Sequence, residues 1–403
     1  MTDTAPDLQS FPMPRSCPFA PPEQYAEIRD KEPVSRVKLP NGKTAWMVTS
    51  HELVRQVLAD PRISSDRRLP GNPQLVPIPP AALEGAMRSM LVMDPPEHTA
   101  HRRLVINEFT VKRIQALRPR IQEIVDERID ALLACDRPAD LVDVLARPVP
   151  ALVICELLGV PYEDRETFYR FGTVVFGEKS TPQEVGAAIM ETRIFLGKLV
   201  AAKEQEPGDD LLSRLIVKYK ELGEGEYDPQ QVVSTAQLLL NAGHETTTSM
   251  ISLGTAALLE HPDQLAALVE DASLIPQAVE ELLRYLSIAD LVTFRTATAD
   301  IQVGDVTIRE GEGVLALSGA ANWDPAAFAE PDKLDIHRNP RQHVAFGYGV
   351  HQCVGANLAR LELEIVFKTL FDRVPGLRLA TPLEELPFLQ RILYGMASLP
   401  VTW

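Results

Sequence analysis

The chain has only four cysteines, Cys17, Cys135, Cys155 and Cys353, and no two of them are spaced as a CxxC pair. Zinc sites built on cysteine usually contain such pairs, so their absence argues against a zinc protein. Four cysteines in 403 residues also argue against a disulfide framework. We therefore expect reduced thiols, and any functional cysteine must be identified from its own surroundings.

Long apolar runs are also missing from the sequence. No stretch approaches the roughly 20 consecutive apolar residues that a membrane-spanning helix needs. The first residues, MTDTAPDLQSFPMP, are polar and proline-rich, and they lack the basic and apolar regions of a signal peptide. We expect a cytoplasmic protein without a membrane anchor.

Basic residues are in deficit, because 40 Lys and Arg stand against 56 Asp and Glu, giving a formal net charge of −16. Nucleic-acid binding requires clustered basic side chains, so this balance argues against it. Residues 98–120 are the exception, since they contain six basic residues and one acid, Glu108. A positive segment of this kind can attract an acidic protein partner.

Thirty-three prolines divide the sequence into many short and medium segments. Apolar residues at helical spacing predict helices over residues 113–133, 140–158, 184–204 and 229–261, and a last one from just after Cys353 to about Phe371. Asn41-Gly42 between apolar runs predicts a hairpin of residues 35–39 and 44–48. Further strands are predicted at 292–297, 301–303, 306–308 and 314–317.

These segments predict a mainly α fold with a large helical part and a smaller β-rich part, packed as one domain over residues 1–403. The helical part covers about 95–285 and 354–372, and the β-rich part about 33–60 and 288–320. The helix predicted at 229–261 would be roughly 50 Å long at about 1.5 Å per residue. Polar residues in its middle are costly to bury unless they have a function or a partner.

The strongest chemical signal is the segment FGYGVHQCVG at residues 346–355. It places Cys353 at the end of a glycine-rich loop, directly before an amphipathic helix. A helix N-terminus stabilises a thiolate, and glycines let the backbone approach a flat cofactor. A lone cysteine is more often a small buried apolar residue. Here the phenylalanine, the glycines and the helix start together favour a thiolate that binds haem iron.

This segment resembles the haem-binding signature of the cytochrome P450 superfamily, F-x-x-G-x-x-x-C-x-G. Further resemblance to the soluble actinomycete members of that superfamily lies in RSCP at 15–18, EFTVKRI at 108–114 and LPVTW at 399–403. The resemblance covers nearly the whole chain. It implies the cytochrome P450 fold, haem b as cofactor and Cys353 as the iron ligand, with Phe346 and Gly347 next to the haem.

The middle of the long helix reads AGHETT at residues 242–247, which resembles the family's oxygen-activation motif. Small residues at Ala242 and Gly243 would leave room for O2. Glu245 and Thr246 would form a carboxylate–hydroxyl relay that delivers protons. A threonine that bonds back to a carbonyl and bends the helix is the alternative, and both can hold. His244 is expected to be structural or to face solvent.

Two more sets of residues follow from the resemblance. Four match the family positions that hold the haem propionates, for which the arginine fork is well suited: His98, Arg102, Arg295 and His351. Three match a structural charge cluster that ties one helix to the loop before the cysteine: Glu281, Arg284 and Arg338. Taken singly, each of these would be an ordinary surface residue or helix pair.

The substrate is expected to meet mostly apolar residues, some from a loop that begins at Met87. They predict a pocket for an apolar molecule, although ordinary core packing explains any single one equally well. These residues are Leu91, Val92, Leu239, Ala242, Ile288, Leu291, Val292, Leu393 and Tyr394.

The resemblance implies a monooxygenase that uses O2 and two electrons to hydroxylate a bulky apolar small molecule, such as a polyketide, statin precursor, macrolide or steroid-like compound. The chain has no flavin or iron–sulfur motif, so a ferredoxin and its NAD(P)H-dependent reductase would supply electrons. Lys112 and Arg113 are predicted to help dock the ferredoxin. The alternatives are a non-enzymatic haem-thiolate sensor, a peroxide-using relative or a structural helical protein. The Glu245–Thr246 pair favours the monooxygenase.

Overall fold

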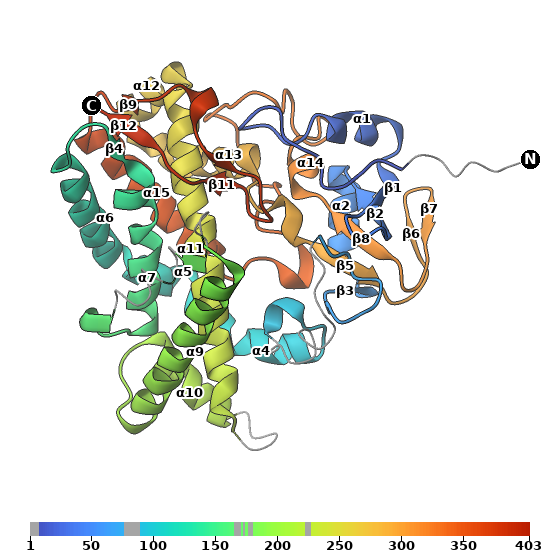
Figure 1. Cartoon of the computed structure of the whole chain (residues 1–403), viewed down its shortest axis with the longest axis horizontal. Helices are drawn as coiled ribbons and strands as arrows, with labels where there is room; N and C mark the ends of the chain where they lie inside the picture. Colours follow the sequence, from blue (N-terminus) through green and yellow to red (C-terminus); the bar gives the residue numbers. More distant parts are fainter. Residues whose placement is uncertain (1–7, 76–88, 165–170, 172–173, 176–179, 222–226) are drawn as a thin grey trace, which may run out of the picture. The chain divides into compact units, whose positions relative to one another are not determined.

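The computed structural model describes residues 8–75, 89–164, 171, 174–175, 180–221 and 227–403 (Figure 1). The chain divides into two compact units. The first comprises residues 1–99, 283–334 and 340–353, and the second comprises residues 100–282, 335–339 and 354–403. Two helices run across a boundary between units, α4 (Glu97–Ile106) and α13 (Ile275–Leu286).

A five-stranded sheet organises the first unit. Its strands, in spatial order, are β1 (Val34–Lys38), β2 (Thr44–Val48), β8 (Gly313–Ala316), β5 (Phe294–Ala297) and β3 (Ile63–Ser64). All neighbouring pairs are antiparallel except β2 and β8, which run parallel. The β1–β2 hairpin turns through Gly42, whose φ of +79° is a conformation that glycine adopts without strain.

Alternate side chains of this sheet enter two separate cores, as the pleat requires. Val48 and Ala316 join one core with the helix α2 (His51–Ala59). Met47 and Leu315 join the other on the opposite face. The unit also contains α1 (Gln24–Lys31), α14 (Ser318–Asn322) and a small hairpin of β6 (Ile301–Val303) and β7 (Val306–Ile308).

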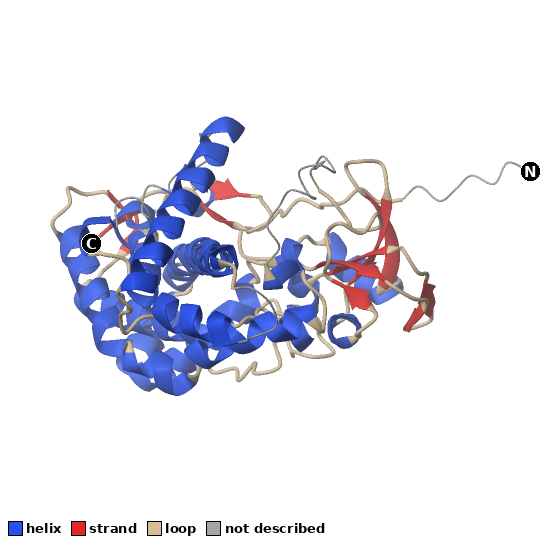
Figure 2. Ribbon diagram, turned by 90° about the horizontal axis from the view of Figure 1, so that it is seen from below, coloured by secondary structure: helices blue, strands red, loops and turns tan. Residues whose placement is uncertain are grey.

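The second unit is mainly helical, and Figure 2 shows in blue how strongly helix dominates the described chain. Two small sheets complete it: β4 (Ala139–Asp140), β12 (Pro400–Thr402) and β9 (Arg378–Leu379), and β10 (Phe388–Leu389) with β11 (Gly395–Met396). Its helices are α5 (Val111–Ala116), α6 (Arg118–Leu133), α7 (Pro148–Leu158), α9 (Pro182–Gln205), α10 (Leu211–Glu221), α11 (Pro229–Leu259), α12 (Pro262–Glu270) and α15 (Ala356–Arg373).

Helix α11 is the long helix that the sequence predicted. Asp228 caps it by accepting a hydrogen bond from the Gln230 amide at 2.9 Å, and Pro229 occupies its first turn. Four of its buried hydroxyls, those of Thr235, Thr248, Ser252 and Thr255, each bond to a carbonyl one turn back in the helix. The Thr248 hydroxyl donates to the His244 carbonyl at 3.0 Å, and the Thr255 hydroxyl donates to the Ile251 carbonyl at 2.7 Å.

Two predicted helices are interrupted, and proline explains both breaks. The segment predicted as 113–133 is two helices that meet at Leu117, because Pro119 has no amide hydrogen and its ring collides with the preceding turn. The segment predicted as 140–158 is a π-helical turn, η3 (Val142–Ala146), followed by α7. Helix α7 begins at Pro148, so the prediction of one continuous helix was wrong there too.

Other predicted elements are confirmed within a few residues, including the 35–48 hairpin, α9 and the strands β6 and β7. Helix α9 starts with a capping box in which Thr181 and Glu184 bond to each other's amides. In the part of the chain that the structure describes, no helix is long and apolar enough to cross a membrane. The single domain and the cytoplasmic location stay predictions.

Candidate functional site

The predicted iron ligand Cys353 ends a tight loop that is closed by its own backbone. The Cys353 amide donates to the Phe346 carbonyl at 2.8 Å, and the Gly347 amide donates to Val344 at 2.9 Å. The Cys353 side chain is exposed, and Gly355, two residues later, is the N-cap of α15. The loop thus presents an accessible sulfur directly before a helix N-terminus, where a thiolate is stabilised.

The two glycines of this loop serve different purposes. Both have positive φ, +70° at Gly347 and +72° at Gly349. A Cβ on Gly349 would collide with the carbonyl of Leu58 in α2, so this glycine permits close packing within the protein. A Cβ on Gly347 would meet only the His351 carbonyl, at 4.0 Å. Close approach to a flat cofactor therefore suits Gly347, whereas Gly349 is needed for the fold.

Three of the four residues predicted to hold the haem propionates, His98, Arg295 and His351, belong to the first unit. The rings of His98, in α4, and His351, in the turn η7 (Gly349–His351), lie with their centroids 4.2 Å apart. Arg295 in β5 is 9% exposed and donates to the Phe294 carbonyl at 2.8 Å. Among the described residues no carboxylate forms an ion pair with it. Arg102 follows His98 by one turn of α4.

Burial, reinforced by the nearby Arg67 and opposed by Asp94, lowers the pKa of Arg295 to about 10. A buried guanidinium in this condition is stabilised by an anion that reaches it, because the charge then has a partner in a poorly solvated place. The carboxylates of haem propionates have this chemistry. The residues present therefore fit the implied cofactor.

The acid–alcohol pair lies in the middle of α11. Thr246 donates from Oγ1 to the Ala242 carbonyl at 2.6 Å, the back-bond that was the alternative explanation for this threonine. Ala242 itself is exposed. Burial raises the pKa of Glu245 to about 7, against the opposing effect of Arg147 and Arg391. A carboxyl with this pKa exchanges protons readily near neutral pH.

Two residues of this motif pack against other parts of the second unit. A Cβ on Gly243 would lie 2.9 Å from Cδ1 of Ile154 in α7, so the small residue also serves helix packing, and its part in leaving room for O2 stays a prediction. Of the two expectations for His244, the structural one holds: it is 1% exposed and its Nε2 lies 3.2 Å from the Arg147 carbonyl. Burial lowers the pKa of His244 to about 4, so the ring is neutral and its role is structural.

The predicted structural cluster is buried at α13. Glu281 accepts hydrogen bonds from Arg338 Nε and from the Asp335 amide, both at 3.1 Å. Arg284 donates to three carbonyls, those of Asn322 at 2.9 Å, Pro331 at 2.8 Å and Lys333 at 3.3 Å. Both side chains are 0% exposed. They hold the end of α14 at Asn322 and the irregular segment that contains Pro331, Lys333 and Asp335.

Glu281→Gln should destabilise the protein strongly, while the same change at the neighbouring Glu280 should not. Removing one charge of a buried pair costs about 3–5 kcal/mol because the other charge stays buried. Glu280 pairs with Arg360, whose side chain is 33% exposed, and such a pair contributes about 0–1 kcal/mol. Urea unfolding followed by circular dichroism measures both. Equal midpoints for the two variants would contradict the assigned role of Glu281.

The basic segment at residues 98–120 is largely neutralised by acids from the second unit. Arg118 pairs with Glu364 at 3.1 Å, and Arg120 with Glu156 at 3.2 Å. Arg113 pairs with Glu108 at 3.3 Å. Lys112 and Arg103 remain exposed and form no ion pair within the residues that the structure describes. The positive patch is therefore smaller than the sequence suggests.

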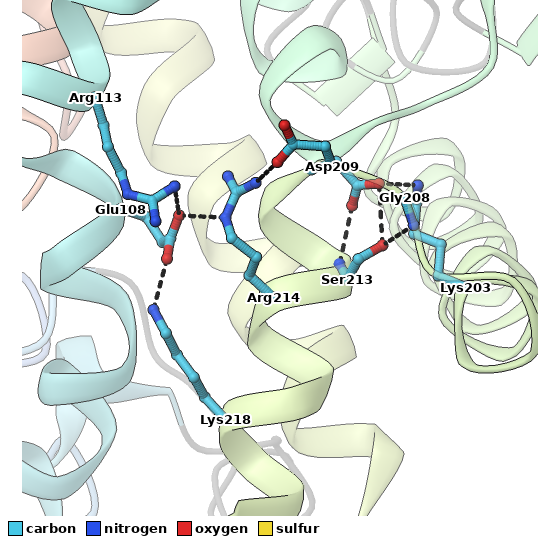
Figure 3. Close-up of polar contacts among 9 residues, drawn as sticks. Glu108, Arg113, Lys203, Gly208, Asp209, Ser213, Arg214 and Lys218 are labelled. Carbon is cyan, nitrogen blue, oxygen red and sulfur yellow. Dashed lines mark hydrogen bonds and ion pairs between the residues drawn. The ribbon is translucent and has the colours of Figure 1, made fainter.

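Glu108, the single acid of that segment, is 2% exposed and is surrounded by cations (Figure 3). Besides Arg113 it binds Arg214 at 2.8 Å and Lys218 at 2.5 Å, both from α10. These partners lower its pKa even though burial acts to raise it. The charge count singled out Glu108, but Arg214 and Lys218 lie about 100 residues away in sequence, and no local pattern could have named them.

The predicted substrate contacts are divided between the units. The first unit contains Leu91, Val92, Ile288, Leu291 and Val292, and the second contains Leu239, Ala242, Leu393 and Tyr394. Leu91 is 48% exposed, whereas Leu239, Ile288 and Tyr394 are buried. The ring of Tyr394 is parallel to that of Phe388, with centroids 6.2 Å apart. Met87, at the start of the predicted loop, lies outside the described residues. The substrate role of this set stays a prediction.

The fold and these motifs match known proteins. The Cytochrome P450 family profile matches residues 185–374. A vitamin D3 dihydroxylase of Streptomyces griseolus is 48% identical over 410 residues, covering 100% of both chains. A pentalenic acid synthase of Streptomyces avermitilis is 49% identical over 395 residues, covering 98% of this chain and 97% of the other. The crystal structure of cytochrome P450 MoxA from Nonomuraea recticatena superposes with a TM-score of 0.93 at 51% identity, covering 98% of both chains.

The chain belongs to the cytochrome P450 family, in the branch found in actinomycetes. It is a monooxygenase with haem as its cofactor, and it has the mainly helical P450 fold that the sequence predicted. A P450 monooxygenase needs O2 and a source of electrons. The non-enzymatic sensor and the structural protein are thereby set aside.

Proposed function

We propose that Cys353 is the thiolate ligand of the haem iron, and that the enzyme hydroxylates a bulky apolar small molecule with electrons from a ferredoxin. The loop of residues 346–353 carries the ligand assignment, because its hydrogen bonds hold an exposed sulfur before a helix N-terminus. When bound, the haem supplies the iron chemistry that activates O2. His98, Arg102, Arg295 and His351 would hold its propionates.

Within this proposal, Thr246 and Glu245 form the relay that delivers protons during catalysis. The Thr246 hydroxyl donates to the Ala242 carbonyl, so its oxygen is positioned to accept a hydrogen bond while its own hydrogen stays bonded. Glu245, with a pKa of about 7, can lose a proton and regain it near neutral pH. The retention of this pair favours O2 and external electrons over the peroxide-using alternative.

The proposed substrate is a polyketide, statin precursor, macrolide or steroid-like molecule. Support comes from the apolar character of the predicted contacts and from the name of one relative, a vitamin D3 dihydroxylase, since vitamin D3 is such a molecule. A screen of apolar ligands for shifts in the haem spin state tests this class. Binding confined to small polar compounds would contradict it.

The proposed ferredoxin site retains Lys112 as its clearest contact. Lys112→Glu should slow reduction by an acidic ferredoxin about 10-fold at low salt, and the difference should shrink as salt screens the charges. Arg113 is a poorer probe than expected, because reversing its charge would also disturb buried Glu108. Stopped-flow reduction measures the rate, with Lys198→Glu, an exposed lysine in α9, as the control of equal charge. An unchanged low-salt rate for Lys112→Glu would refute the docking role.

A further inference from the structure

Asn322, the last residue of α14, is 0% exposed and uses both ends of its side-chain amide. Its Nδ2 donates to the Ser287 hydroxyl at 2.9 Å, and its Oδ1 accepts from the Val344 backbone amide at 2.8 Å. A backbone amide can only donate, so the side-chain oxygen must face Val344 and the nitrogen must face Ser287. All three residues belong to the first unit, and none is more than 2% exposed. One buried side chain therefore links two chain segments that are far apart in sequence.

The first of these segments begins at Ser287, directly after α13. Ser287 has a φ of +41°, a left-handed conformation that glycine adopts more easily than serine. Its hydroxyl donates to the Arg284 carbonyl at 2.8 Å while it accepts from Asn322, and a hydroxyl can do both. Its conformation sets the path of residues 288–292, which contain three of the predicted substrate contacts. What serine adds at this position, where glycine would be less strained, is the hydroxyl.

The second segment leads to Cys353. Val344 is held on both sides, because Asn322 binds its amide and the Gly347 amide donates to its carbonyl at 2.9 Å. Two residues later, the Phe346 carbonyl accepts from the Cys353 amide at 2.8 Å. The bond from Asn322 thus holds the start of the loop that ends at the cysteine.

Asn322 is itself fixed to the end of α13. Its carbonyl accepts from Nη1 of Arg284 at 2.9 Å. The next residue, Trp323, donates from Nε1 to the Tyr285 carbonyl at 2.8 Å, and its ring stacks on that of Tyr285 with centroids 5.2 Å apart. Because these contacts tie α14 to α13, a shift of Ser287 is passed on through Asn322.

We propose that Asn322 is a positioning residue for the iron ligand, and that Ser287 acts on Cys353 through it. The two side-chain bonds keep the loop of residues 346–353 in the form that presents an accessible sulfur. Because Ser287 begins the segment of predicted substrate contacts, a substrate that displaces this segment reaches the thiolate by the same route. The inference rests on the proposed function for the role of Cys353.

Ser287→Gly in the haem-loaded enzyme removes the hydroxyl and leaves the bond between Asn322 and Val344 in place. The variant should fold as stably as the wild type, because glycine relieves the strain at φ +41°. The thiolate Soret band of its ferrous carbon monoxide complex should nevertheless disappear about 10-fold faster in mild urea, since Nδ2 of Asn322 is left without its buried acceptor. Absorbance gives the half-time of the band, and circular dichroism of the same samples reports folding.

Thr293→Val is the matched control, because it removes a hydroxyl from the other end of the same segment. That hydroxyl donates to the Ala316 carbonyl and not to Asn322. The half-time of this variant should stay within about twofold of the wild-type value, the usual margin for independent sites. A change below that margin in Ser287→Gly, or an equal change in Thr293→Val, would overturn the proposal.

A double variant tests whether Ser287 acts through Asn322. Asn322→Ala should shorten the half-time at least as much as Ser287→Gly, and combining the two changes should add nothing further. Additive effects would show that Ser287 acts by another route and would overturn that part of the proposal. If Asn322→Ala does not fold, the comparison of Ser287→Gly with Thr293→Val still decides.

The same spectra separate this inference from the proposed function. A wild-type protein without a thiolate signature would remove the assignment of Cys353 itself. A wild-type thiolate signature, with equal half-times in wild type and Ser287→Gly, would remove only the link through Asn322.

Discussion

Replacing Cys353 with histidine should abolish hydroxylation while leaving the protein folded and able to bind haem. A thiolate ligand donates electron density to the iron and favours cleavage of the O–O bond, which an imidazole does far less. The loop should persist, because it is held by backbone hydrogen bonds from Cys353 and Gly347 and not by the side chain. We expect product formation to fall by more than about 100-fold, the upper range for residues that merely orient a metal ligand.

Product formation with a surrogate ferredoxin and reductase, together with haem content, measures the effect of the Cys353→His change. Cys17→Ser is the matched control, since Cys17 is also an exposed cysteine in the first unit. That control should retain wild-type activity. Hydroxylation by Cys353→His at a rate near that of the wild type would contradict the ligand assignment.

In the Thr246→Ala variant, electrons should still be consumed while hydroxylation of the substrate falls. The variant lacks the hydroxyl of the proposed proton relay, so O2 should be reduced to peroxide while product formation falls about 100-fold, within the usual range for proton-transfer catalysts. Thr246→Ser keeps the hydroxyl and the bond to the Ala242 carbonyl, and it should restore much of the product. Loss of activity in both variants would indicate that the methyl group and the helix geometry matter more than the hydroxyl.

Glu245, next to Thr246 in sequence, should make proton delivery depend on pH. Because the pKa of Glu245 is about 7, the carboxyl is mostly protonated below that pH and mostly ionised above it. A proton donor works in its protonated form, so product formed per electron should decline as pH rises through about 7. Glu245→Gln should be slower and lack this decline. An identical pH profile in the variant would exclude Glu245 as the proton donor.

Local sequence patterns were sufficient for the parts of the molecule that depend on nearby residues. The Asp228 cap, the hairpin at Asn41-Gly42 and the helix that follows Cys353 all came from short-range signals. The breaks at Leu117 and Pro148 were not predicted, because apolar residues keep helical spacing on both sides of each break. The nearby prolines, which lack an amide hydrogen, nevertheless interrupt the helices there.

Contacts between distant parts of the chain were beyond any local pattern. Arg147 and Arg391 set the charge around Glu245 from positions about 100 and 150 residues away. Gly243 belongs to the expected motif, and only the folded chain shows that it also packs against Ile154 on another helix. Likewise, the charge count singled out Glu108, and only the folded chain shows that Arg214 and Lys218, about 100 residues further on, bind it.

The central claim is that Cys353 binds the haem iron as a thiolate in an enzyme that uses the Glu245–Thr246 pair. The most direct measurement is the carbon monoxide difference spectrum of the reduced wild-type protein. We expect the Soret maximum typical of thiolate-ligated haem, and its loss in Cys353→His. A Soret maximum typical of histidine-ligated haem, in wild-type protein that is active, would contradict it.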